Sequence, residues 1–148
     1  MTGNLAAVLG NDPPSAVEAA SPEAGARPYA ILVVEDEVAT LESLELTLGE
    51  DYTVFTASSG KQGLEILERE EIALVIVDQV MAPMSGVEFL ERAIAIRPQA
   101  IRIMLTGYAD INSVVRAINE GRIYRYIAKP WDIDALRVDV KRALETYR

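Results

Sequence analysis

The sequence contains no cysteine and no histidine. Without cysteine there are no disulfides, no thiol nucleophiles and no thiolate metal sites. Without histidine the chain lacks the usual general base, the Ser-His-Asp arrangement and the commonest zinc ligand. The chemistry open to this chain therefore rests on carboxylates, hydroxyls, lysine and hard cations that prefer oxygen ligands.

Positive charge and long apolar runs are also scarce. There are 14 Lys and Arg against 23 Asp and Glu, and the resulting net charge of −9 argues against direct binding to a nucleic-acid backbone. No apolar run reaches the roughly 18 residues of a membrane helix. No basic residue precedes Arg27, so the start does not resemble a signal peptide. We expect a cytoplasmic protein that does not enter a membrane.

The composition divides the 148 residues into two parts. Residues 1–28 are rich in Ala, Pro, Ser and Gly, which predicts a flexible tail without a core of its own. Residues 29–148 carry most of the large apolar side chains and have the size of one domain, roughly 100–150 residues. We therefore expect a single folded domain after the tail.

Strand and helix patterns alternate along residues 29–148. Apolar, β-branched and aromatic runs predict strands at 30–34, 52–56, 72–77, 101–105 and 124–128. Amphipathic spacing and caps predict helices at 38–48 and 60–70, after the Ser85–Glu88 capping box, from Asp110 to Gly121, and from Asp132 onward. This alternation predicts an α/β fold with a parallel sheet and helices on both faces. By analogy with other doubly wound sheets we expect the flavodoxin-like strand order 2-1-3-4-5.

Polar residues stand at the carboxyl ends of four predicted strands. Glu35 and Asp36 follow the first strand, Asp78 the third, Thr106 the fourth and Lys129 the fifth. Ligands of such sheets bind at this edge, where strands 1 and 3 are neighbours about 4.8 Å apart. Three carboxylates this close repel one another unless a cation lies among them, and Mg²⁺ accepts carboxylate, water and phosphate oxygens. With a hydroxyl and an ammonium group added, the set predicts a socket for a phosphoryl group beside a carboxylate nucleophile.

At these positions the sequence resembles the receiver domain of two-component response regulators. The segments that carry the resemblance span the predicted domain and are Ile31-Leu-Val-Val-Glu-Asp-Glu37, Leu74-Val-Ile-Val-Asp78, Leu105-Thr-Gly107 and Lys129-Pro130. The family usually has proline four residues after the acceptor, where this chain has Ala82 followed by Pro83. The stretch 119–126 is similar to that of receivers attached to HD-GYP phosphodiesterase or transcription-activating output domains.

The resemblance implies that Asp78 is the residue that becomes phosphorylated. Its donor is expected to be the phosphohistidine of a sensor histidine kinase or phosphotransfer protein, because this chain has no histidine. Thr106 and Lys129 are expected to contact the phosphoryl group, and the bond from Lys129 to Pro130 is expected to be cis. Such a domain catalyses its own phosphorylation and dephosphorylation without being an enzyme in the ordinary sense.

The resemblance also implies a Mg²⁺ site. Asp36 is expected to ligate the metal directly, beside Asp78. Glu35 is expected to act on it mostly through water, and Val80 to offer its backbone carbonyl.

A conformational switch is the third implication. Phosphorylation is expected to draw Thr106 inward, so that Tyr126 fills the vacated space and the fourth and fifth strands repack with their helices. The alternative for Tyr126 is an ordinary core aromatic. Whether this face serves an output domain or a homodimer is left open.

Three other functions start from the same fold. A flavin binder needs a Gly- and hydroxyl-rich phosphate loop after the first strand, where residues 35–37 are Glu-Asp-Glu. An aspartate-nucleophile phosphatase needs a second aspartate where Val80 stands. A receiver-like interaction module that works without phosphorylation stays open as the alternative, although every position of the phosphoryl socket is filled.

Overall fold

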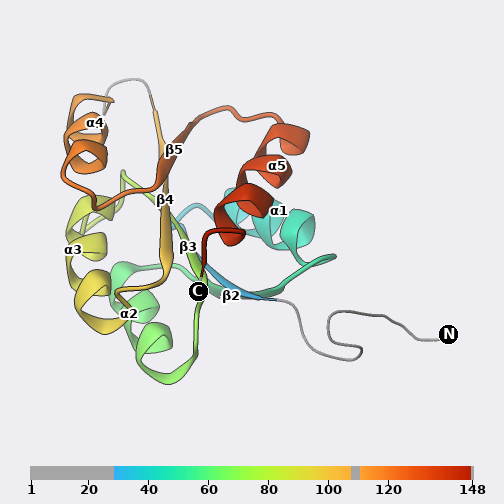
Figure 1. Cartoon of the computed structure of the whole chain (residues 1–148), viewed down its shortest axis with the longest axis horizontal. Helices are drawn as coiled ribbons and strands as arrows, with labels where there is room; N and C mark the ends of the chain where they lie inside the picture. The colour runs from blue at the N-terminus through green and yellow to red at the C-terminus, as the bar shows by residue number, and fades with distance from the viewer. Residues whose placement is uncertain (1–28, 108–110, 148) are drawn as a thin grey trace, which may run out of the picture.

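The computed structural model describes residues 29–107 and 111–147 (Figure 1). The predicted tail at 1–28 and the predicted helix cap at Asp110 lie outside the described residues. Within them, strands and helices alternate in the order β1 (Ala30–Val34), α1 (Val38–Leu48), β2 (Thr53–Ala57), α2 (Gly60–Arg69), β3 (Leu74–Asp78), α3 (Gly86–Ile96), β4 (Ile101–Thr106), α4 (Ile111–Asn119), β5 (Arg125–Ala128) and α5 (Ile133–Leu144). No helix in this part of the chain is long and apolar enough to cross a membrane.

The strands form one parallel sheet in the order β2-β1-β3-β4-β5. This confirms the predicted α/β class and the flavodoxin-like order. β1 lies in the middle of the first three strands, where Ile31 pairs with Val54 of β2 and with Leu74 of β3. The order changes direction at β1, so the carboxyl ends of β1 and β3 lie side by side, and this is where such sheets bind ligands.

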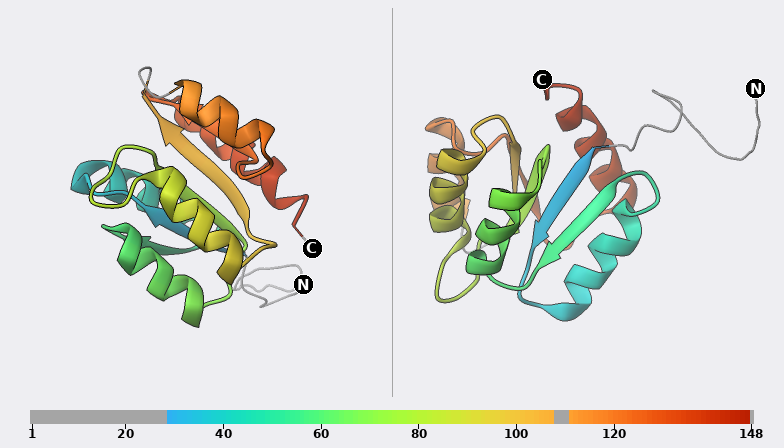
Figure 2. Two further views of the ribbon diagram at one scale, coloured as in Figure 1. Left: turned by 90° about the vertical axis from the view of Figure 1, so that its left-hand side faces the viewer. Right: turned by 90° about the horizontal axis from the view of Figure 1, so that it is seen from below.

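Helices cover both faces of the sheet, α1 and α5 on one and α2, α3 and α4 on the other (Figures 1 and 2). Alternate residues of β1 serve the two layers. Ile31 belongs to the buried cluster with Leu44 of α1 and Val140 of α5, whereas Leu32 belongs to the cluster with Phe89 of α3. Because side chains of a strand point alternately to opposite faces, a strand buried on both faces must be apolar throughout.

The predicted helix starts hold where the structure describes them. Ser85 and Glu88 form the predicted capping box of α3, and the Asp132 side chain accepts a hydrogen bond from the N–H of Ala135 at the start of α5. Both caps satisfy N–H groups that the first turn of a helix leaves without a partner.

Several predicted strand limits were wrong by one or two residues. β2 begins and ends one residue later than predicted, at Thr53 and Ala57, because its ladder with β1 runs over these residues. β3 begins at Leu74 and extends to Asp78, which pairs with Leu105 of β4. Asp78 is thus the last residue of the strand, and its backbone is paired with β4.

Arg102 fastens the opposite, amino-terminal end of the sheet. Its guanidinium donates to the backbone oxygens of Arg122 (2.7 Å), Ala100 (3.0 Å), Pro98 (3.3 Å) and Gly121 (3.4 Å). Two of these oxygens lie in the α4–β5 connection, which is thereby tied to β4. Burial lowers the pKa of Arg102, yet its ordinary value is so high that the guanidinium stays charged.

Candidate functional site at the carboxyl end of the sheet

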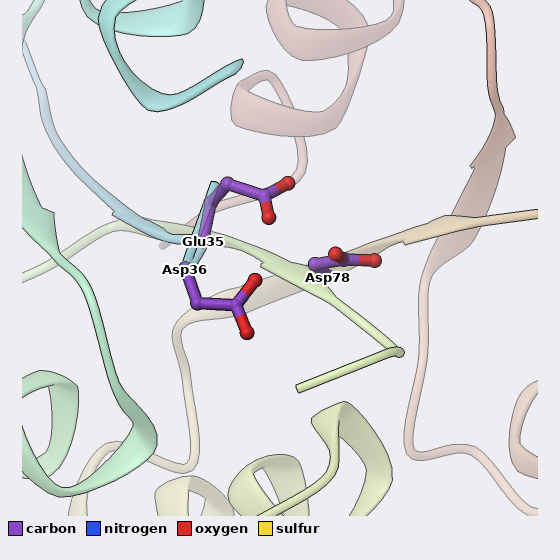
Figure 3. Close-up of side chains that lie close together, drawn as sticks. All are labelled: Glu35, Asp36 and Asp78. Atoms are coloured by element: carbon purple, nitrogen blue, oxygen red, sulfur yellow. The ribbon is translucent and has the colours of Figure 1, made fainter. Parts of the chain in front are cut away.

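Three carboxylates meet where β1 and β3 end. Glu35 and Asp36 follow β1, Asp78 closes β3, and carboxylate oxygens of all three lie within 4.8 Å of one another. Figure 3 shows the side chains of Glu35 and Asp36 turned towards Asp78. Glu35 is 1% exposed and Asp78 3% exposed, whereas Asp36 is open to solvent. The predicted acidic cluster is therefore present, with two of its members buried.

Of the three carboxylates, Glu35 has the least favourable surroundings for a negative charge. Its Oε2 accepts a hydrogen bond from the N–H of Glu37 at 3.1 Å, but its buried Oε1 has no hydrogen-bond partner among the described residues. Burial, aided by the nearby Asp78, raises the pKa of Glu35 to about 7, although the hydrogen bond from the N–H of Glu37 and the charge of Lys129 both act to lower it. A buried carboxylate that is short of partners is suited to accept a cation.

Lys129 supplies the positive charge of the site. Its Nζ lies 3.0 Å from Oδ2 of Asp78 and 3.6 Å from Oε1 of Glu35. Burial alone would lower the pKa of Lys129, but the hydrogen bond and charge of Asp78, supported by Glu35, raise it overall. The backbone N–H of Lys129 donates to the oxygen of Thr106, and the Lys129–Pro130 bond is cis, as predicted.

Thr106 is buried at the end of β4, and its hydroxyl donates to the backbone oxygen of Gly107 at 3.0 Å. In the β4–β5 ladder Thr106 pairs with Ala128, and Tyr126 stands two residues before Ala128. Because every second residue of a strand points to the same face, Thr106 and Tyr126 share a face of the sheet. Tyr126 is 37% exposed, more than is expected of the ordinary core aromatic that was its alternative.

The loop after β3 carries two residues that matter to the site. Val80 is exposed, and its N–H lies 3.3 Å from Oδ1 of Asp78. Val80 is predicted to offer its backbone carbonyl to the metal, and the contact present in the structure is that of its N–H. Gln79 was not predicted to take part, although its side-chain oxygen accepts a hydrogen bond from the N–H of Val87 in α3. The only sequence signal for Gln79 is its place directly after Asp78.

These donors fit a hard divalent cation. Glu35, Asp36 and Asp78 offer carboxylate oxygens only, and the orphaned Oε1 of Glu35 lacks a partner that a cation or its water would provide. Mg²⁺ prefers one or two carboxylates together with water and phosphate oxygens, and the exposed side of Asp36 leaves room for such ligands. The cluster is thus chemically matched to the predicted metal.

Comparisons with known proteins agree with this geometry. The family described as "Response regulator receiver domain" matches residues 31–141. The chain is 38% identical over 118 residues to the hydrogenase transcriptional regulatory protein HoxA of Bradyrhizobium diazoefficiens, which covers 80% of this chain and 24% of that protein. It is 33% identical over 115 residues to sporulation initiation phosphotransferase F of Bacillus subtilis, which covers 77% of this chain and 92% of that protein. The chain thus spans about a quarter of the length of the HoxA regulators and nearly all of the phosphotransferase.

Solved structures show the same fold. The signal receiver domain of an HD domain-containing protein from Pseudomonas fluorescens Pf-5 is 38% identical, with a TM-score of 0.75, and the match covers 80% of this chain and 96% of that one. A CheY-like response regulator receiver domain protein from Methanospirillum hungatei is 35% identical, with a TM-score of 0.74, and the match covers 80% and 94% of the two chains. The chain belongs to the receiver domain family of two-component response regulators.

Proposed function

We propose that this receiver domain accepts a phosphoryl group on Asp78 from the phosphohistidine of a sensor histidine kinase or a phosphotransfer protein. The observation that carries the proposal is the ion pair between Lys129 and the buried Asp78 at 3.0 Å, inside a cluster of three carboxylates. A carboxylate oxygen of Asp78 forms the new bond to phosphorus while the bond from phosphorus to the donor histidine breaks. Water later cleaves the acyl phosphate, which releases phosphate and restores Asp78.

The side chains around Asp78 have separate tasks in this reaction. Lys129 draws the Asp78 carboxylate towards itself and adds positive charge where phosphoryl oxygens arrive, so it acts by position and electrostatics. Glu35, Asp36, Asp78 and the backbone carbonyl of Val80 would hold Mg²⁺. When bound, the metal supplies the charge that lets an anionic donor approach three carboxylates.

Thr106 and Tyr126 form the switch in this proposal. The Thr106 hydroxyl, now bonded to the oxygen of Gly107, turns to the phosphoryl group, and Tyr126 on the same face moves into the vacated space. The change reaches the surface formed by β4, α4, β5 and α5. A phosphoryl group adds about 1.5 to 2 negative charges, which is enough to bias two packed arrangements of one element.

The same proposal covers the surroundings of the domain. Residues 29–148 form the receiver. The response is passed to an output domain or a homodimer, and the regulator relatives favour a transcription-activating output, since their names describe transcriptional regulatory proteins. The domain works in the cytoplasm, without direct contact to nucleic acid or membrane.

Intact mass spectrometry tests the acceptor and the metal together. Wild-type protein and Asp78→Asn are incubated with Mg²⁺ and acetyl phosphate, with and without a chelator. We expect one phosphoryl adduct on the wild type only, and none when the chelator is present. An adduct that persists in Asp78→Asn would place the acceptor elsewhere, and a wild type that binds Mg²⁺ without any adduct would favour the phosphorylation-independent interaction module.

A further inference from the structure

Gln79, the residue directly after the proposed acceptor, joins three elements of the fold. Its backbone N–H donates to the oxygen of Leu105 in β4 at 3.0 Å. Its backbone oxygen accepts from the N–H of Gly86 at 3.0 Å, and its side-chain Oε1 accepts from the N–H of Val87 at 2.9 Å. The end of β3 is thereby tied to β4 on one side and to the first two residues of α3 on the other.

The first turn of α3 depends on Gln79 for two of its hydrogen bonds. The opening N–H groups of a helix have no partner within the helix and are usually satisfied by the residue just before it. In α3 that residue is Ser85, whose side chain accepts from the N–H of Glu88 at 3.2 Å and whose backbone oxygen accepts from the N–H of Phe89 at 2.9 Å. The N–H groups of Gly86 and Val87 go to Gln79 instead, so the helix start is docked onto the residue beside Asp78.

Close backbone contact reinforces this docking. A Cβ added to Gly86 would lie 2.6 Å from the backbone oxygen of Asp78 and 2.8 Å from Cα of Gln79, closer than such atoms can approach. Glycine therefore lets the first residue of α3 rest directly on the backbone of the acceptor. A displacement of the α3 start cannot occur without also changing the surroundings of Asp78.

The loop that these contacts close contains Val80. The Val80 N–H lies 3.3 Å from Oδ1 of Asp78, so the loop backbone contacts the carboxylate of the acceptor directly. The two bonds of Gln79 to α3 close the base of this loop, because they join residue 79 to residues 86 and 87. The side-chain bond is the part that a substitution can remove without altering the backbone.

We propose that Gln79 is a positioning residue for the receiver site. Its amide oxygen, bonded to the N–H of Val87, holds the β3–α3 loop closed and thereby places the Val80 backbone and the Asp78 carboxylate for Mg²⁺ binding and phosphoryl transfer. This inference rests on the proposed function, and it adds a residue whose side chain contacts neither the metal nor the phosphoryl group.

The test removes the side-chain bond in two ways. Gln79→Met keeps the length of the side chain without the acceptor oxygen, and Gln79→Asn keeps the amide but is one methylene too short to reach Val87. Ser85→Ala is the matched control, since it removes one acceptor from the same helix turn without touching the residue beside Asp78. Each protein is measured by titration calorimetry with Mg²⁺, by its rate of phosphorylation with acetyl phosphate, and by its thermal midpoint.

We expect both Gln79 variants to bind Mg²⁺ roughly 10-fold more weakly, as is common when a group that orients metal ligands is lost. Phosphorylation at a fixed Mg²⁺ concentration should slow accordingly. Ser85→Ala should lower the thermal midpoint about as much as the Gln79 variants do, but it should keep the Mg²⁺ affinity of the wild type.

Three results would overturn the proposal. One is wild-type Mg²⁺ affinity in both Gln79 variants, and another is an equal loss of affinity in Ser85→Ala, which would make the effect one of helix stability. The third is the absence of a cooperative thermal transition in both Gln79 variants, which would make Gln79 a folding residue. In these cases a wild type that still binds Mg²⁺ and forms an Asp78-dependent adduct leaves the proposed function intact, whereas a wild type that does neither refutes both.

Discussion

The two ends of the sheet satisfy their charged side chains to different degrees. At the amino-terminal end, the guanidinium of Arg102 donates to four backbone oxygens, and every one of these bonds stabilises the fold. At the carboxyl end, Glu35 and Asp78 are buried together, and Oε1 of Glu35 has no hydrogen-bond partner among the described residues. The Arg102 guanidinium thus finds hydrogen-bond acceptors within the protein, whereas the Glu35 carboxylate has one oxygen without a hydrogen bond from any described residue.

This difference separates structural from functional charge. A buried ionised group that is fully hydrogen-bonded holds its neighbours in place and is costly to remove. A buried group that lacks partners destabilises the fold until a ligand supplies them, so its presence indicates that a ligand is expected there. The lysine between the acidic side chains, Lys129, relieves part of the repulsion and leaves room for a cation to relieve the rest.

The largest expected effect is on the stability of the amino-terminal end. Arg102→Met leaves four backbone oxygens without their donor, so we expect the free energy of unfolding to fall by about 3 kcal/mol. Urea unfolding followed by circular dichroism measures the loss. Arg102→Lys keeps the charge but not the planar fork of donors, and it should recover only a part of the stability. Mg²⁺ affinity should be that of the wild type, and a weakened affinity would break the separation of the two ends.

An effect of similar size and opposite sign is expected at Glu35. Between its ordinary pKa of 4.5 and its folded pKa of about 7, Glu35 keeps a proton in the folded chain that the unfolded chain has released. The free energy of unfolding of the metal-free domain should therefore fall as the pH rises through this interval, by about 3 kcal/mol in total. Glu35→Gln should abolish this fall and make the metal-free domain more stable than the wild type above about pH 7.

Unfolding in urea with a chelator, from about pH 5 to about pH 8, checks the Glu35 prediction. Mg²⁺ should reverse the trend in the wild type, because the metal binds the deprotonated carboxylate. Arg102→Met serves as the control, since its stability should be lower at every pH but should depend on pH as that of the wild type does. Parallel curves for the wild type and Glu35→Gln would show that Glu35 is ionised throughout and would remove the contrast between the two ends.

The smallest effect is expected for an ion pair that belongs to neither end. Arg125 of β5 lies 3.2 Å from Asp139 of α5, with side chains 52% and 21% exposed. The Arg125 side chain is half exposed to water, so Arg125→Ala should lower the free energy of unfolding by less than about 0.5 kcal/mol. The same urea experiment, repeated at high salt, should remove even this difference. A loss as large as that of Arg102→Met would mean that burial does not decide which charges stabilise this fold.

Much of the fold and the site could be predicted because the signals are local. Continuous apolar runs revealed the strands, and the residues after them, among them Glu35, Asp78 and Lys129, were predicted to meet because parallel strands place their carboxyl ends together. Strand limits were less predictable. Tyr124, for example, is an aromatic residue of the kind that favours strands. However, β5 begins at Arg125, because the ladder with β4 decides where the strand begins.

Contacts between residues far apart in the sequence could not be predicted. Arg102 donates to the backbone of Arg122, 20 residues away, and a lone arginine in a strand carries no sign of such a partner. The Gln79 side chain is bonded to the backbone of Val87, eight residues away, and any backbone N–H could have served it equally well. Backbone groups are the same at every position, so only the folded chain selects one.

The sequence by itself determined the class of fold, the edge of the sheet that carries the site, and the acidic, hydroxyl and ammonium groups that gather there. These follow from periodic burial and from the order of residue types at strand ends, which are properties of short segments. The tertiary structure set how many hydrogen bonds each charged group makes: Oε1 of Glu35 has none among the described residues, whereas Arg102 donates to several backbone oxygens. Burial and hydrogen bonding depend on every element packed around a group, and therefore exist only once the whole chain has folded.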